Sequence, residues 1–253
     1  MYMADAIDIV VLNCNNDVLI QNSIASIISN TNGRYNLIVV DQDSKDGTKE
    51  WLIENKPAAH LILNKRNVGM AEGWNQGIRA GRYPWIAFVH SDTVIMDPEW
   101  LDKMWNYTID RRIGMIEARI SHGTWDGEMR YGGMAFCLIR RQCLNEVGYF
   151  DKQFIVGPDL DWFVRLEWSW WKTAYCPDTN VLHIGNGTMQ ACLKTKAEEL
   201  TQAAYDILKL KYTALFLEKT LVARSRRRMV LKEELLHGTN GRDAGTDGGG
   251  DTA

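Results

Sequence analysis

The chain has 253 residues, of which 45% are hydrophobic and 24% charged, and its formal net charge is −3. This length suits one large α/β domain with an appendage, or two small domains, and this composition can bury a core. The net negative charge predicts no obligate nucleic-acid or membrane partner for the molecule as a whole.

Targeting and redox features are few. No run approaches the ~18 apolar residues of a membrane span, and the N-terminus lacks the basic and apolar regions of a signal peptide. The five cysteines form no C-x-x-C pair, and their odd number argues against a disulfide framework. These features predict a reducing, cytoplasmic setting.

The first half of the chain alternates apolar strands with helices. Strands are expected at Ile7–Leu12, Leu37–Val40, Leu61–Leu63 and Trp85–Val89. The helices between them are expected to begin near Asn16 or Asp17 (either as the cap), at Thr48 and near Ala71, and the first has one apolar face made of Ile20, Ile24, Ile27 and Ile28. Such a β-α series is typical of a parallel, doubly wound sheet. Gly73 and Gly77 within the third helix indicate close approach of a neighbour or a ligand, since each costs about 1 kcal/mol relative to alanine.

The second half predicts a mixed arrangement. A helix is expected to start at Asp97-Pro98-Glu99, and strands are expected at Ile113–Ile120 and Gly133–Ile139. A short helix closes at Gly148, a Trp-rich helix begins near Pro158, and Val181-Leu182-His183 is expected to form a late short strand.

The C-terminal part has a different pattern. From Thr195 to about Leu236, apolar residues step by three and four, which predicts one long amphipathic helix docked on the main domain. Four arginines interrupt its apolar stripe: Arg224, Arg226, Arg227 and Arg228. The predicted organisation is a main domain over 1–190, with a first half at about 5–95 and a second half at about 96–190. A helical appendage follows over 191–237, and then a disordered, Gly-rich tail over 238–253.

The feature around which the chain is organised is the end of the strand at 85–89. His90 and Asp92 follow it on alternate residues, so their side chains point the same way. In open α/β sheets the ligand crevice lies just beyond the C-terminal ends of the strands. A carboxylate and an imidazole there suit a divalent metal that holds phosphate oxygens. The ordinary alternative is a strand-end Asp in a turn, with His90 as its polar neighbour.

Taken in order, several segments resemble those of the family 2 glycosyltransferases with the GT-A fold. The resemblance covers roughly residues 5–190 and rests on the strand and Asn-rich turn at 7–17, Val39–Thr48, Asn67-Val68-Gly69 with Asn75 and Gly77, His90-Ser91-Asp92-Thr93, Val147–Asp151, Asp159-Leu160-Asp161, and His183. It implies an α/β fold of GT-A type, with a Rossmann-like, mostly parallel sheet flanked by helices. It also implies a nucleotide-diphosphate sugar bound across the first half of that sheet.

The resemblance implies roles for particular residues. Residues at the positions that bind the nucleotide are Asn13, Asn15, Asn16, Asp41, Gln42, Asn67, Gly69 and Asn75. Asp92 matches the last acid of the family's DxD motif, which binds Mn²⁺ or Mg²⁺, and His183 matches a late histidine that reaches the metal or the diphosphate. Asp159 matches the general base, and Arg165 is expected near the phosphates.

Two departures from the family pattern leave alternatives open. His90 stands where the first Asp of DxD is usual, which favours Mn²⁺ over the oxygen-preferring Mg²⁺, and Pro158 stands where a Glu often precedes the base. Asp161 is the alternative base, and its ordinary role would be to cap its helix. Four tryptophans, Trp162, Trp168, Trp170 and Trp171, are either core residues or a platform on which an acceptor sugar stacks.

The function predicted from the resemblance is metal-dependent, inverting transfer from a nucleotide-diphosphate sugar, a UDP-sugar by default, to an acceptor hydroxyl. The alternatives are a catalytically inactive nucleotide-sugar-binding protein and a nucleotidyltransferase. The turn at 13–17 lacks the Gly and Lys that a nucleotidyltransferase loop carries. The acceptor stays open, because the resemblance covers enzymes that act on polysaccharides, lipid-linked sugars, proteins and modified nucleic acids. The arginine cluster favours a hydroxylated base in DNA, with contact to an anionic membrane surface as the rival.

Overall fold

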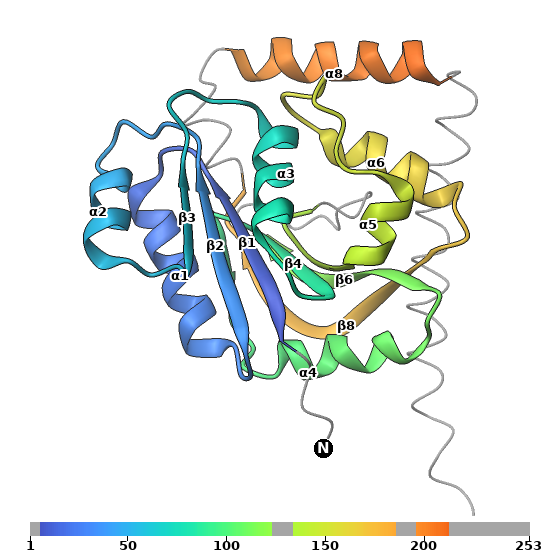
Figure 1. Ribbon diagram of the computed structural model, residues 1–253, viewed down its shortest axis with the longest axis horizontal. Coiled ribbons are helices and arrows are strands. Elements are labelled where there is room, and N and C mark those ends of the chain that lie inside the picture. Colours follow the sequence, from blue (N-terminus) through green and yellow to red (C-terminus); the bar gives the residue numbers. More distant parts are fainter. Residues whose placement is uncertain (1–5, 123–133, 186–195, 213–253) are drawn as a thin grey trace, which may run out of the picture.

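The computed structural model of the protein describes residues 6–122, 134–185 and 196–212. These residues form one eight-stranded sheet with the order β3-β2-β1-β4-β7-β6-β8-β5, covered by helices on both faces (Figure 1). The sheet is the α/β architecture expected from the sequence.

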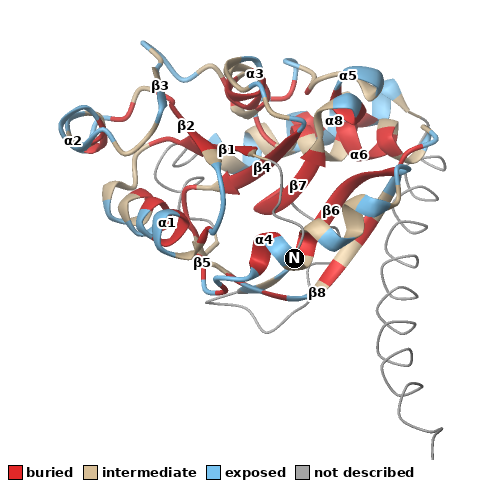
Figure 2. Cartoon of the chain, turned by 60° about the horizontal axis from the view of Figure 1, so that its bottom comes forward, coloured by how far each residue is buried: buried red, intermediate tan, exposed pale blue. Residues whose placement is uncertain are grey.

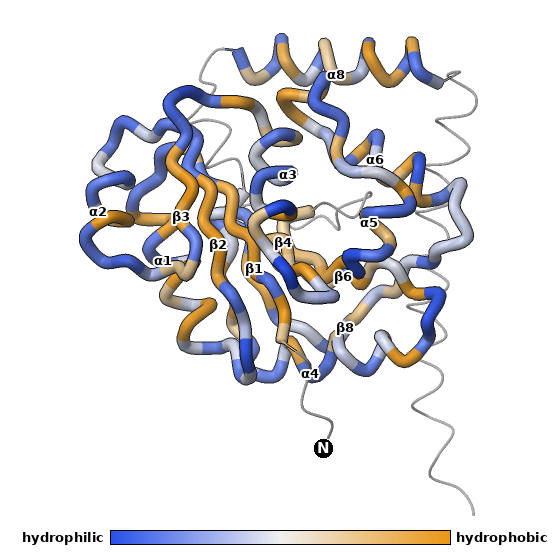
Figure 3. Tube along the Cα trace, viewed as in Figure 1, coloured by the Kyte–Doolittle hydropathy of each residue, from blue (hydrophilic) through white to orange (hydrophobic). Residues whose placement is uncertain are grey.

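The first half is a regular β-α alternation. The parallel strands are β1 (Ile7–Asn13), β2 (Tyr35–Asp41), β3 (His60–Leu63) and β4 (Trp85–His90). The helices between them are α1 (Asp17–Asn30), α2 (Thr48–Asn55) and α3 (Met70–Ala80). Every residue of β1 is buried, because helices cover this part of the sheet on both faces. Figure 2 shows the buried central strands, and Figure 3 shows their apolar composition.

The second half is mixed, as the sequence predicts. Its elements are β5 (Thr93–Ile95), α4 (Trp100–Trp105), the 3₁₀ helix η1 (Asn106–Ile109), β6 (Ile113–His122), β7 (Phe136–Arg140), α5 (Arg141–Val147), α6 (Pro158–Glu167), β8 (Lys172–His183) and α8 (Ala197–Lys211). Strand β7 runs antiparallel to both β4 and β6, whereas β6 and β8 are parallel. The direction of the sheet therefore changes next to β4, where the His90-x-Asp92 motif lies.

Two apolar cores lie on opposite faces of the sheet. One packs α1, α2 and α4 against one face, with Trp100 fully buried in it. The other packs α3, α5 and α6 against the opposite face, around Trp74 and Trp162. The glycines of α3 allow this packing, because a Cβ at Gly77 would overlap Val10 of β1 and one at Gly73 would overlap Leu12.

Several local expectations differ from the structure. Ile28 of α1 is 53% exposed, so only Ile20, Ile24 and Ile27 form the buried face. Asn16 occupies the cap position of α1 in a left-handed conformation, but its side chain makes no capping hydrogen bond. Helix α4 begins at Trp100 rather than at Asp97, because the Asp97 side chain accepts a hydrogen bond from the Glu99 backbone N–H (2.9 Å) and forms a turn first.

The last strand is longer than expected. Val181-Leu182-His183 is the end of β8, a strand of twelve residues. Exposed and buried residues alternate along much of it, and this pattern lacks the continuous apolar run that marks a strand buried on both faces.

Helix α8 docks on the main domain, as expected, but it ends early. Ala204 and Leu208 are buried against Phe154, whereas Leu210 is 88% exposed. Tyr212 has an extended backbone (φ −132°, ψ 142°), so one uninterrupted helix from Thr195 to Leu236 is not formed. The arginine cluster at 224–228 and the Gly-rich tail at 238–253 lie outside the described residues.

Two further points concern the chain as a whole. None of the described helices combines the length and the apolar character needed to cross a membrane. Cys14 takes part in a disulfide, whereas the odd number of cysteines argued against a disulfide framework. Cys137, Cys143 and Cys176 are buried free thiols.

Candidate active site

The candidate metal site forms where β4 ends. His90 is the last residue of β4, and the chain turns at Ser91 and Asp92 into β5. Strand β5 pairs with the end of β8, where Thr93 lies opposite His183. This pairing brings His183 beside Asp92, although the two residues are far apart in the sequence.

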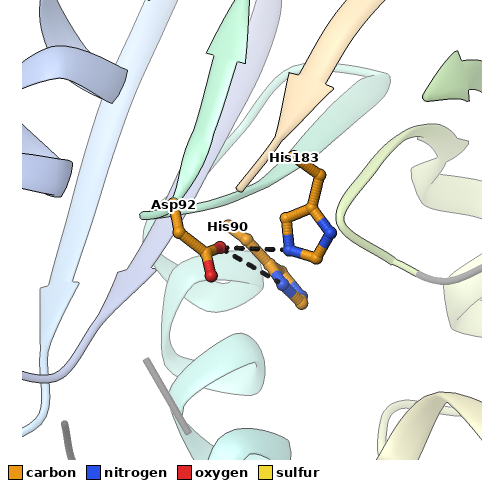
Figure 4. A group of neighbouring side chains, drawn as sticks. All are labelled: His90, Asp92 and His183. Carbon is orange, nitrogen blue, oxygen red and sulfur yellow. Dashed lines mark ion pairs between the residues drawn. The ribbon is translucent and has the colours of Figure 1, made fainter. Parts of the chain in front are cut away.

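The three side chains converge (Figure 4). His183 Nε2 lies 3.2 Å from Asp92 Oδ1, and His90 Nδ1 lies 4.0 Å from the same oxygen. One ligand atom from each residue falls within 4.8 Å of the other two. The His90 ring stacks on Trp74 of α3, with ring centroids 5.8 Å apart, and this contact fixes its orientation.

Burial sets the charge of these groups. It lowers the pKa of His90 to about 4, so the ring is neutral near pH 7 and keeps a lone pair for a metal. Burial by itself would raise the pKa of Asp92, but interactions with His183 and His90 lower it to about 2. Among the described residues, His90 Nε2 is buried and has no hydrogen-bond partner. One carboxylate and two imidazoles fit Mn²⁺ better than Mg²⁺.

A second polar cluster lies where β1 and β2 end, at the same edge of the sheet. Asn13 Nδ2 donates to Asp41 Oδ1 (3.2 Å) and to Ser44 Oγ (3.3 Å), and Ser44 also hydrogen-bonds Asp41. The Asn15 backbone N–H donates to Ser44 Oγ (2.6 Å), so Ser44 joins the two turns. Asn13 Oδ1 and Asn16 Nδ2 are buried without a hydrogen-bond partner in the described part of the chain. Asn13 Oδ1 can therefore accept a hydrogen bond from a ligand, and Asn16 Nδ2 can donate one.

Gln42, Asn67 and Gly69 lie beside this cluster and shape one loop. Gln42 Nε2 donates to the Gly69 carbonyl oxygen (2.8 Å), and Gln42 Oε1 accepts from the Val68 backbone N–H (3.1 Å). Asn67 Oδ1 accepts from the Gly69 backbone N–H (2.8 Å). These bonds fix the loop that opens α3, a role that the prediction of nucleotide contacts did not include.

Two predicted ligand residues are engaged elsewhere. Asn75 exchanges two hydrogen bonds with the backbone of Phe150, at 2.8 and 3.1 Å, and is buried. The Arg165 guanidinium donates to Asp161 and to the carbonyl oxygens of Val147, Gly148 and Tyr149. Both side chains tie the loop after α5 to a helix, and the contacts of Asn75 with nucleotide and of Arg165 with phosphate stay predictions.

Asp159 and Asp161 lie in the first turn of α6 in very different surroundings. Asp161 is fully buried and accepts hydrogen bonds from Arg165 Nε (2.9 Å), Lys211 Nζ (2.7 Å) and the Tyr212 hydroxyl (3.0 Å). It does not cap the helix, since Gly157 occupies the cap position. Asp159 is half-buried, so of the two it is the one with access to solvent or substrate.

A comparison of the sequence with protein-family models assigns the family. Residues 8–160, more than half of the chain, match the family model described as glycosyl transferase family 2. The chain belongs to that family.

Solved structures of other transferases have the same GT-A fold. The mannosyltransferase PcManGT from Pyrobaculum calidifontis, in complex with GDP-Man and Mn²⁺, is 13% identical with a TM-score of 0.60, and the match covers 92% of this chain and 79% of that one. TarS 1-349 from S. aureus is 14% identical with a TM-score of 0.61, covering 94% and 74%. GalNAc-T7 with UDP, GalNAc and Mn²⁺ is 14% identical with a TM-score of 0.60, covering 71% and 43%. No protein with a curated function matches the chain.

The tryptophans of this glycosyltransferase do not form a platform beside the acids. Trp162 is fully buried and donates to the Gly148 carbonyl oxygen (3.0 Å), and Trp171 is also buried. Trp168 and Trp170 are exposed, but they lie at the opposite end of α6 from Asp159.

Some residues of this family member's site were missed. Ser44 had a local signal, because it lies only three residues after Asp41 in the same strand-end turn, and the Ser44 backbone N–H donates to Asp41 Oδ2 (3.0 Å). Lys211 and Tyr212 had no signal, because they reach Asp161 from a helix fifty residues further along the chain.

Proposed function

We propose that the protein is a metal-dependent, inverting glycosyltransferase that moves a sugar from a nucleotide-diphosphate sugar to an acceptor hydroxyl. The observation that carries the proposal is the convergence of His90, Asp92 and His183 at the edge of the sheet where the Asn13 and Asp41 cluster also lies. A UDP-sugar is the default donor, and a GDP-sugar is the alternative, because similar structures hold UDP or GDP-Man.

The nucleotide is assigned to the cluster at the ends of β1 and β2. Asn13 Oδ1 and Asn16 Nδ2 supply an acceptor and a donor that have no hydrogen-bond partner within the described residues. Asp41 is held by Asn13 and Ser44, so its carboxylate is fixed in place before the donor binds. Prior positioning of this kind reduces the entropy that binding costs.

His90, Asp92 and His183 would hold the metal ion, and their nitrogen-rich ligand set favours Mn²⁺. When bound, a divalent cation supplies positive charge that stabilises the leaving diphosphate. Because the pKa of Asp92 is lowered to about 2 and that of His90 to about 4, these two groups can bind a cation near pH 7 without first losing a proton.

Asp159 is assigned as the general base. Its carboxylate accepts the proton of the acceptor hydroxyl as that oxygen attacks the anomeric carbon and the bond to the diphosphate breaks. Asp159 lies on α6, whereas the metal ligands lie on β4, β8 and the turn after β4. Base and leaving group on opposite sides of the sugar suit direct displacement, which inverts the anomeric carbon.

The proposal has one alternative for the activity and leaves two classes of acceptor. A catalytically inactive protein that binds nucleotide sugars is the alternative, because His90 and Pro158 depart from the family pattern. The acceptor is proposed to be a saccharide or a hydroxylated base in DNA, with a cytoplasmic location. The arginines that favour the polyanion, and the rival membrane surface, lie outside the described residues.

The test combines donor screening with one substitution. UDP-, GDP- and dTDP-sugars are tested with Mn²⁺ by thermal shift, and turnover is followed as release of the nucleoside diphosphate. Asp92→Ala is expected to abolish both turnover and the Mn²⁺-dependent part of the shift. Asp102→Ala, at an exposed position of α4, is the control and should behave as the wild type. Normal turnover by Asp92→Ala would overturn the proposal, and donor binding by the wild type without turnover would favour the inactive alternative.

A further inference from the structure

The segment that leads into Asp159 is attached to α3 on one side. Residues 148–157 join α5 to α6. Asn75 of α3 hydrogen-bonds both the backbone N–H and the carbonyl oxygen of Phe150. The Met70 backbone N–H, at the start of α3, donates to the Ile155 carbonyl oxygen (2.9 Å). These hydrogen bonds therefore hold the joining segment against α3.

On its other side the same segment is attached to α8, which lies across it (Figure 1). Lys211, the last residue of α8, donates to Asp151 Oδ2 (2.6 Å) and to Asp161 Oδ1 (2.7 Å). These carboxylates lie on either side of the Asp159 position in the chain. Ala204 and Leu208 of α8 pack on Phe154 between them. Lys211 therefore joins the start of the segment to the first turn of α6.

The charges of this network balance. Asp151 and Asp161 are the anions, and Lys211 and Arg165 are the cations. Asp161 is fully buried, so the loss of one of its two cations weakens the compensation of a buried charge. Without Lys211, Asp161 keeps Arg165 and the Tyr212 hydroxyl as partners, but the first turn of α6 loses its link to Asp151 and is held less firmly. Asp159 lies two residues from Asp161 and would move with it.

We propose that Lys211 is a positioning residue for transfer. By binding Asp151 and Asp161 together, it fixes the first turn of α6 and thereby places Asp159, so that α8 is part of the acceptor side of the active site. The inference rests on the proposed function, because Asp159 is the base only if the protein is a transferase.

Lys209 provides a matched control on the same helix. Its side chain is 62% exposed, and its ion-pair partner is Asp206 of α8 itself, at 3.7 Å. Replacing Lys209 or Lys211 by Met removes the same charge and keeps a similar length of side chain. Only Lys211→Met removes a bond to the segment that leads into α6.

The experiment measures donor hydrolysis with Mn²⁺ for the wild type and three variants. Lys211→Met is expected to lower kcat by ~10-fold or more, because small displacements of reacting groups cost up to ~100-fold. Its KM for the donor should stay within about two-fold of the wild-type value, since the nucleotide cluster and the metal ligands are untouched. Lys211→Arg should recover most of the lost rate, and Lys209→Met should equal the wild type.

A double-mutant cycle with Asp161→Asn tests whether Lys211 affects kcat through its bond to Asp161. If Lys211 acts through Asp161, its replacement should cost much less in kcat when Asp161 is already Asn. Amide hydrogen exchange over 148–161 gives a readout without turnover, and Lys211→Met should speed exchange there while Lys209→Met does not.

Two results would overturn the inference. One is wild-type kcat and wild-type exchange in Lys211→Met. The other is an equal loss of kcat and donor affinity that Lys211→Arg does not restore, which would mean general destabilisation. Failure of the wild type to turn over any donor is a separate outcome that contradicts the proposed function. Amide hydrogen exchange over 148–161 would then still show whether Lys211 holds this segment in place.

Discussion

Asp159 and Asp161 show how the surroundings of a carboxylate, rather than its place in a motif, determine what it can do. Asp161 is fully buried, and its oxygens accept hydrogen bonds from Arg165, Lys211 and Tyr212. A carboxylate held in this way is a poor partner for a proton that must arrive and leave. Asp159, two residues earlier, is half-buried and lies in the same turn. The general base of the proposed reaction is therefore assigned to Asp159.

Asp159→Asn should separate binding from chemistry. Donor affinity should remain within a few-fold of the wild-type value, while the transfer rate should fall by ~10²–10⁴-fold, the range for loss of a general base. Single-turnover kinetics with saturating donor measures the chemical step directly. Asp161→Asn is the control and should lower the melting temperature more and the transfer rate less. Equal single-turnover rates for wild type and Asp159→Asn would place the base elsewhere.

At the scale of single elements, the bounds of a helix or strand could be predicted where a local sequence pattern marks them. Helix α2 begins at Thr48, as the sequence predicts, and β1 differs from its prediction by one residue. A continuous apolar run marks β1, and Asp46-Gly47 directly precedes α2, so a local pattern is enough to place the start of each element. The glycines of α3 likewise indicated a close neighbour, and the structure identifies that neighbour as β1.

Features that depend on distant contacts could not be predicted in this way. The apolar pattern continues past Lys211, yet α8 ends there, where Lys211 and Tyr212 bind Asp161. Asn75 and Arg165 are polar residues near a site, which is how ligand-binding residues look in a sequence. Only the folded chain shows that they bind backbone groups of the loop after α5. The meeting of His183 with Asp92 likewise requires the pairing of β5 with β8.

Gly77→Ala should destabilise the contact between α3 and β1. A methyl group at Gly77 would overlap the Val10 side chain, which is fully buried and has no room to move. Overpacking of this kind costs about 1–3 kcal/mol, although alanine is the better helix former. Urea unfolding measures the change in the free energy of unfolding. Val10→Ala in the same chain should recover part of the loss, and a Gly77→Ala variant as stable as the wild type would contradict the packing.

At the scale of the whole molecule, the two halves of the sheet meet at a group of titratable side chains. His90 ends β4 and stacks on Trp74 of α3, while His183 ends β8. Burial lowers the pKa of His90 from 6.5 to about 4. Without metal, the unfolded chain therefore binds a proton at His90 between these pH values, whereas the folded chain does not. Folding stability must fall as the pH falls through this window.

The metal-free protein should accordingly lose stability in two stages on acidification. From about pH 6.5 to 4, His90 lowers the free energy of unfolding by at most about 3 kcal/mol, because one pKa unit corresponds to about 1.4 kcal/mol and the ring is partly exposed. Below pH 4 the loss continues, because the pKa of Asp92 is lowered to about 2 and that of Asp151 is also lowered. Both carboxylates contribute stability only while they are ionised, so protonation removes it.

Melting temperatures measured in EDTA from pH 8 to 3 test both stages. His90→Gln carries no titrating ring at this position, so its melting temperature should change much less between pH 6.5 and 4 and then fall with the carboxylates as in the wild type. A wild-type melting temperature that stays constant or rises between pH 6.5 and 4 would contradict a neutral, buried His90. It would also weaken the assignment of that ring as a metal ligand that is ready to bind at neutral pH.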